Sequence, residues 1–148
     1  MKIKDIALGA FVSGIIAVIL KDIFDFFYFL VDFPGVHPVY IAAGTFLSTD
    51  RIFSPIGIII GYVAHLTVGG LLGFIFLKLL VVSNPQNILL KGIFYGLCVW
   101  LLLAGALLTL GISRYVPTDE YTKTMLLLDH LVYGSSLGYL IPKISKVD

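Results

Sequence analysis

Four long apolar stretches, separated by short polar segments, make up most of this sequence. A helix needs about 20 predominantly apolar residues to cross the hydrocarbon core of a bilayer, and each stretch is close to that length or longer. The pattern predicts an all-α fold, an integral membrane four-helix transmembrane bundle that forms one domain over residues 1–148. Proline cannot continue a helix interior, so the last helix is expected to stop at Pro142. The expected helices cover about 6–31, 56–82, 88–112 and 124–141.

The segment between the first two stretches carries a further short apolar run. It opens with Pro34, Gly35 and Pro38 and is apolar from Val39 to Leu47. That run is too short to span a bilayer, so it predicts a short interfacial or re-entrant helix over about 39–47, against the outer leaflet.

The composition identifies lipid as the surroundings of this chain. Of its 148 residues 59% are hydrophobic and 13% are charged, and the mean hydropathy is +1.03, whereas soluble domains carry about 25% charged residues. A net charge of +1 without a basic run predicts no nucleic-acid partner. The segments outside the membrane are too short for a catalytic domain, and no nucleophile lies beside a base. The chain is therefore not expected to be an enzyme.

Lysine and arginine positions predict the orientation of the helices. Basic residues gather on the cytoplasmic side of membrane proteins. The opposite side holds Arg51, Arg114, Lys123 and most of the acids. Both termini are therefore expected in the cytoplasm, with external loops at about 32–54 and 113–123. The basic residues of the cytoplasmic side are Lys2, Lys4, Lys78, Lys91, Lys143 and Lys146.

Two of the apolar stretches share the pattern H-L-x-x-G-x-x-L-G. Residues 64–76 read AHLTVGGLLGFIF and residues 129–141 read DHLVYGSSLGYLI, and the two align without a gap. This predicts two helix hairpins in tandem, related by a pseudo-two-fold axis along the membrane normal. Chance is the alternative, because leucine and glycine are common in this chain.

The glycines of this pattern predict where helices meet. Gly69 with Gly73, and Gly134 with Gly138, are four residues apart and share a helix face that lets another helix approach closely. A histidine stands four residues before each first glycine, so both histidines are expected to face neighbouring helices.

Ionisable residues inside apolar helices predict a buried polar cluster. A charge at this depth is expensive, so such groups face the interior and pair with one another. Asp22 is expected to reach the external interface, and His37 to be a loop residue. The cluster is interpreted either as a proton relay or ligand site, or as polar contacts that hold helices together. Its expected members are Lys21, Asp25, His65, Asp129 and His130, joined by Tyr62 and Tyr133.

Cofactor chemistry follows from the same residues. No metal and no cofactor are expected, with haem b as the alternative, because two facing histidines in a helical bundle could ligate it. A zinc site from His65, His130 and Asp129 is conceivable by ligand type. It is less favoured, because adjacent residues of a helix point about 100° apart.

The chain carries a set of short motifs: Lys21 with Asp25, Pro34, His65, Gly92 to Leu97, and His130 to Val132. In these motifs it resembles the YagU-like group of small bacterial inner-membrane proteins. The resemblance implies a multi-pass protein of the inner (cytoplasmic) membrane with four helices. The group has no established biochemical activity, and an association with acid tolerance would fit a titratable cluster. The chain departs from the group in a shorter first external loop.

Three functions are open at this point. The first is a non-enzymatic interaction or assembly protein, or an accessory subunit, that forms a homo-oligomer or binds a membrane-protein partner through its glycine faces. The second is a small proton or solute channel or transporter that uses the polar cluster. The third is a haem or quinone redox subunit. In each case membrane lipid surrounds the chain.

Overall fold

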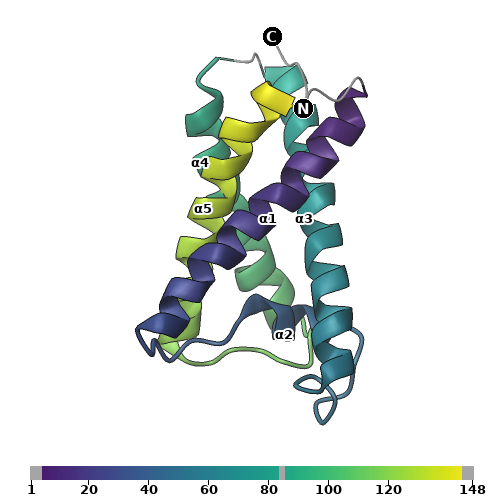
Figure 1. Ribbon diagram of the computed structural model, residues 1–148, viewed down its shortest axis with the longest axis vertical. Helices are drawn as coiled ribbons and strands as arrows, with labels where there is room; N and C mark the ends of the chain where they lie inside the picture. Colours follow the sequence, from purple (N-terminus) through teal and green to yellow (C-terminus); the bar gives the residue numbers. More distant parts are fainter. Residues whose placement is uncertain (1–4, 84–85, 145–148) are drawn as a thin grey trace.

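The computed structural model describes residues 5–83 and 86–144, which form helices and loops without a strand (Figure 1). The expected all-α class is confirmed. A π-helical segment, η1, continues the fourth helix, and its wider turns interrupt the regular hydrogen-bond pattern. The elements are α1 (Ile6–Leu30), α2 (Pro38–Ala43), α3 (Pro55–Ser83), α4 (Ile88–Trp100), η1 (Leu101–Leu107) and α5 (Glu120–Ile144).

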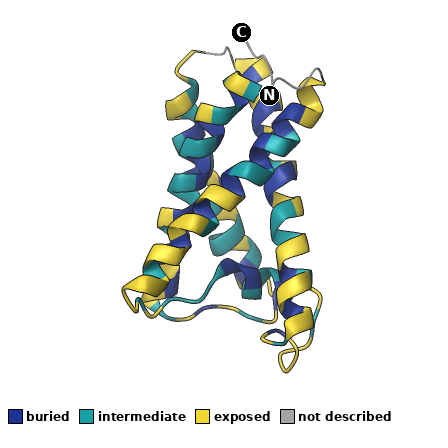
Figure 2. Ribbon diagram, viewed as in Figure 1, coloured by how far each residue is buried: buried dark blue, intermediate teal, exposed yellow. Residues whose placement is uncertain are grey.

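Three helices are long and apolar enough to cross a membrane: α1, α3, and α4 together with η1. The outward faces of the helices carry large exposed hydrophobic side chains, such as Phe29 and Val82 (Figure 2). Such a surface is expected in lipid, and these helices are compatible with a multi-pass membrane protein. Helix α5 is as long as α1 but more polar, so its place as a fourth span remains a prediction.

Helix α5 differs from its expected bounds at both ends. It begins at Glu120 because Asp119 accepts a hydrogen bond from the backbone N–H of Thr122 (2.6 Å) and caps the first turn. It continues through Pro142 to Ile144, so the expected stop at Pro142 is wrong. Pro142 has no backbone N–H to donate, but it lies in the last turn of α5, so only a hydrogen bond near the end of the helix is lost.

The short helix α2 is tucked against α3. Its Val39 and Ala43 are buried, and the Val39 carbonyl lies so close to Gly61 of α3 that a side chain there would collide with it. Helix α2 ends at Ala43, before the expected residue 47, and turns continue the chain beyond it. This packing places the start of α2, and with it His37, beside α1 and α3.

The four long helices pack in the order α3, α1, α5, α4, with α1 and α5 in the middle (Figure 1). Helix α1 begins and α5 ends at one end of the molecule, and α2 lies at the other. A pseudo-two-fold axis between the hairpins would relate α1 to α4 and α3 to α5. Helices α3 and α4 would then pack against each other as closely as α1 and α5 do. Instead α3 and α4 make few contacts, so the sides of the molecule are not equivalent.

Glycines hold the two outer helices against the inner ones. On α1, Gly14 faces Gly69 and Gly73 of α3, and an added Cβ would collide with partner backbone. The same contact recurs between α4 and α5, where Gly92 faces Gly134 and Gly138. The glycine faces therefore lie against each other within one chain. The tandem duplication remains a prediction, and these matching contacts agree with it.

Candidate functional site

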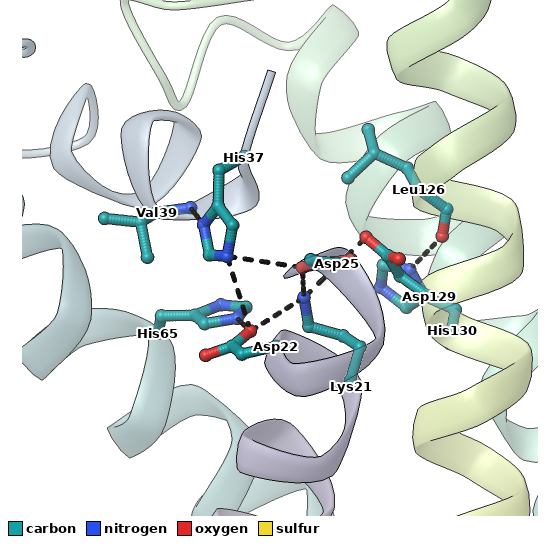
Figure 3. Close-up of polar contacts among 9 residues, drawn as sticks. All are labelled: Lys21, Asp22, Asp25, His37, Val39, His65, Leu126, Asp129 and His130. Atoms are coloured by element: carbon teal, nitrogen blue, oxygen red, sulfur yellow. Dashed lines mark hydrogen bonds and ion pairs between the residues drawn. The ribbon is translucent and has the colours of Figure 1, made fainter. Parts of the chain in front are cut away.

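Six side chains from α1, α3, α5 and the turn before α2 meet around one ammonium group (Figure 3). The Lys21 Nζ lies 2.7 Å from Asp25 Oδ2 and 2.9 Å from Asp22 Oδ1. It lies 3.7 Å from Asp129 Oδ2. We name this group the Lys21 cluster: Lys21, Asp22, Asp25, His37, His65 and Asp129.

Helix geometry and helix packing both build the cluster. Lys21 and Asp25 are one turn apart, so their side chains meet on one face of α1. That face is turned inward, and Lys21 is 4% exposed. Asp129 reaches the ammonium because α5 packs against α1. The cluster thus links α1 and α5, the two middle helices, through the ion pair between Lys21 and Asp129.

His37 lies in the loop before α2, as expected, and it also belongs to the cluster, which was not expected. Its Nδ1 accepts a hydrogen bond from the Val39 backbone N–H (3.2 Å) and caps α2. In a neutral ring the proton is then on Nε2, which lies 3.3 Å from Asp25 Oδ2. The sequence signal that could have predicted this cap is a histidine directly before Pro38, because proline is favoured at the first position of a helix.

Asp22 also belongs to the cluster, and its expected place at the external interface is wrong. Its Oδ1 lies 3.3 Å from Nε2 of His65, besides its contact with Lys21. Asp22 is about 100° around the helix from Lys21. The long lysine side chain nevertheless reaches it, and α3 brings His65 to that side of α1.

Histidine 37 lies outside the membrane-spanning helices, and its protonation predicts a pH dependence. Burial and then the Lys21 charge lower the pKa of His37 to about 4, against about 6.5 in an unfolded chain. Below pH 6.5 the unfolded state binds the extra proton and the folded state does not. We therefore expect the melting temperature to fall between about pH 6.5 and 4. A His37→Gln variant should lose that part of the decline, and an unchanged pH profile would contradict the assignment.

Three further residues expected in the cluster make other contacts. His130 Nδ1 lies 2.6 Å from the carbonyl oxygen of Leu126, within its own helix. The Tyr133 hydroxyl donates to the Gly69 carbonyl oxygen (2.7 Å) and links α5 to α3. The Tyr62 ring lies 5.9 Å from the His37 ring, at the edge of the cluster.

Asp22, Asp25 and His37 have the ligand types of a metal site, with ligand atoms within 4.8 Å of one another. The Lys21 ammonium contacts the same two carboxylates. It therefore takes the place beside these acids that a metal cation would have. This set differs from the zinc ligands expected from sequence. Haem b also remains a prediction, and the two candidate histidines make different contacts: His65 Nε2 faces Asp22, and His130 Nδ1 is bonded within α5.

The acids of the cluster outnumber its cations. Three carboxyl groups surround one ammonium. In the part of the chain that the structure describes, no hydrogen bond reaches Oδ1 of Asp25 or either oxygen of Asp129, and Asp129 is 0% exposed. Buried polar atoms without a partner are rare and call for an explanation.

A small cavity of about 50 Å³ leads away from these acids. Lys21 and Asp129 line it, together with His65 and His130. Imidazole and carboxyl groups are the side chains that exchange protons near neutral pH. The cavity therefore places a second imidazole within the surroundings of the unpaired acid.

Comparisons of this chain with protein-family models, with curated proteins and with solved structures found no match. The resemblance to YagU-like proteins thus rests on the short sequence motifs alone. The Lys21 cluster has to be interpreted from its own geometry and charge.

Proposed function

We propose that this chain spans the bacterial inner membrane four times, with both termini in the cytoplasm, and moves protons through the Lys21 cluster. Three apolar helices support the spans. Lysines 78, 91 and 143 support the orientation, because they are the basic residues of the end where α1 begins and α5 ends. Lys2, Lys4 and Lys146 were used for the same prediction and lie outside the described residues.

The observation that carries the proton proposal is the set of buried carboxyl oxygens of Asp25 and Asp129 that have no hydrogen bond. Asp25 and Asp129 lie close together, because an oxygen of each is near the same Lys21 Nζ, at 2.7 and 3.7 Å. A single proton between the two acids would give a hydrogen bond to oxygens that otherwise have none. Because two carboxylates at close range repel each other, such a pair readily holds one proton. The pair is suited to accept and release a proton.

Polar contacts that merely hold helices together explain the cluster less well. Interhelical hydrogen bonds in membranes contribute on average about 0.6 kcal/mol. An ionised acid near the bilayer centre costs at least about 2.5 kcal/mol. The glycine contacts and the Tyr133 bond already join these helices. Holding the helices together does not require three carboxyl groups around one lysine.

The surroundings of the cluster favour a carrier over an open pore. His37 gives access from the α2 end, since 26% of its side chain is exposed. Toward the other end, Gly14 and Gly92 bring their helices into backbone contact with α3 and α5. That half of the protein would have to rearrange to release a proton. We therefore expect proton flux that saturates with the imposed gradient.

Proteoliposomes with a pH-sensitive dye inside test this proposal. Wild type should acidify the lumen under an inward proton gradient with valinomycin and potassium, and Asp129→Asn should lower the initial rate at least tenfold, since the amide cannot carry the proton. Asp50→Asn changes an exposed acid far from the cluster and should behave as wild type. Equal rates for wild type, Asp129→Asn and empty vesicles would refute the proposal.

Assembly through glycine faces was the first function expected from sequence. In this structure Gly69, Gly73, Gly134 and Gly138 all face other helices of the same chain. A homo-oligomer, or a complex with a membrane-protein partner, would therefore need a different surface. Assembly remains a proposal with less support than proton movement.

A further inference from the structure

A second, much larger cavity of about 630 Å³ lies between α2, α3, η1 and α5. Its volume is in the range of pockets that bind small molecules, about 300–1,000 Å³. It adjoins the small cavity at His65 and His130, which line both. Most of its wall is apolar, including Ile41, Ile60, Val68, Leu103 and Leu107.

The cavity lies on the side where the helix arrangement is unequal. Helices α1 and α5 pack closely, whereas α3 and α4 make few contacts. The π-helical segment η1 forms the opposite wall through Leu103, Ala104 and Leu107. Single π-helical turns are rare and often mark functional sites. The cavity thus lies where α3 and α4 are apart and where η1 departs from α-helical geometry.

His130, in the wall of this apolar space, offers a hydrogen-bond acceptor. Leu126 offers a carbonyl oxygen to Nδ1 of His130 (2.6 Å), so Nδ1 carries a proton. No carboxylate contacts the ring, and a neutral imidazole then presents a lone pair on Nε2. Within the described residues Nε2 has no hydrogen-bond partner. The hydroxyls of Thr67 and Ser113 are already bonded, to the backbone oxygens of Val63 and Ile41.

The lining determines what kind of molecule fits. No Asp, Glu, Lys or Arg lines the cavity, so a phosphate or ammonium headgroup would be buried without a partner. An apolar body with one O–H donor would fill the space and pair with Nε2 of His130. We propose that this cavity binds a neutral lipid whose only polar group is a hydroxyl, held by a hydrogen bond to His130. This site does not depend on proton movement through the Lys21 cluster.

Fluorescence quenching of Trp100 tests the site, because the sequence has one tryptophan. Trp100 directly precedes η1, and Leu103 and Ala104, which line the cavity, follow it by three and four residues. The probe is a brominated long-chain alcohol added to the protein in mild detergent, compared with its methyl ether, which lacks the donor. Wild type should show saturable quenching and bind the alcohol about two- to tenfold more tightly than the ether, the effect of one neutral hydrogen bond.

Two variants separate the hydrogen bond from the cavity. His130→Phe should bind alcohol and ether equally, while His130→Gln, which keeps an acceptor, should retain part of the preference. Ala104→Phe should fill the cavity and abolish saturable quenching by both probes, and circular dichroism checks that each variant is folded. Non-saturable quenching in wild type, or an equal affinity for alcohol and ether, would overturn the proposal. A dimer that shields Trp100 from both probes would also overturn it, since a second copy would then cover the opening.

Discussion

Replacing Lys21 with methionine is expected to lower the free energy of unfolding by about 3–5 kcal/mol, the usual effect of removing one partner from a buried ion pair. Lys21 is the single ammonium among three carboxyl groups, and its side chain is 5% exposed. Unfolding by SDS at neutral pH, followed by circular dichroism, measures the change. Lys78→Met is the matched control, because Lys78 is exposed and lies over the Phe74 ring. Its effect should stay below about 1 kcal/mol.

A combined variant shows whether the loss comes from unpaired acids. Lys21→Met together with Asp25→Asn and Asp129→Asn should recover most of the stability, because the two most buried acids are then uncharged and Asp22 keeps its contact with His65. Lowering the pH should narrow the gap between Lys21→Met and wild type, since protonation removes the same charges. If Lys21→Met alone unfolds like wild type, the ammonium does not balance the acids of the cluster.

The sequence pattern was sufficient for the fold class and for the approximate position of each long helix. Apolar runs of membrane-spanning length and regular glycine spacing are local features, and both can be recognised without knowing the packing. The irregular segment η1 was not foreseeable in this way. Its sequence, LLLAGAL, is as apolar as a regular helix, so nothing in the pattern distinguishes it from one.

The candidate site was foreseeable only where its residues are neighbours in sequence. The spacing of Lys21 and Asp25 predicts their pair, which the structure has at 2.7 Å. The contacts of His37 with the cluster were not foreseen because they depend on α2 folding back against α3. The contact of Asp22 with His65 was not foreseen because it depends on α3 packing against α1. His130 lines the small cavity together with Lys21 and Asp129, but its Nδ1 is hydrogen-bonded to the Leu126 carbonyl oxygen one turn away in α5.

Replacing Gly96 with alanine is expected to lower the free energy of unfolding by about 1–3 kcal/mol, as overpacking of a close contact does. An added Cβ at Gly96 would collide with the carbonyl oxygen of His130 and crowd Gly134 across the α4–α5 contact. Gly105 offers a matched control, since its Cβ would meet only Leu101 Cδ1, at 3.9 Å. Gly105→Ala should stabilise the protein by up to about 1 kcal/mol through helix propensity.

The size of each variant in mild detergent decides whether the glycine face lies within one chain or between copies. With Gly96 and Gly134 packed against each other inside the chain, Gly96→Ala should lower the melting temperature and leave the oligomeric state unchanged. If the face joined two copies instead, the same substitution would change the particle size and leave the melting of the separated chain near that of wild type. A change in size without a loss of stability would therefore refute the α4–α5 contact and revive assembly through the glycine faces.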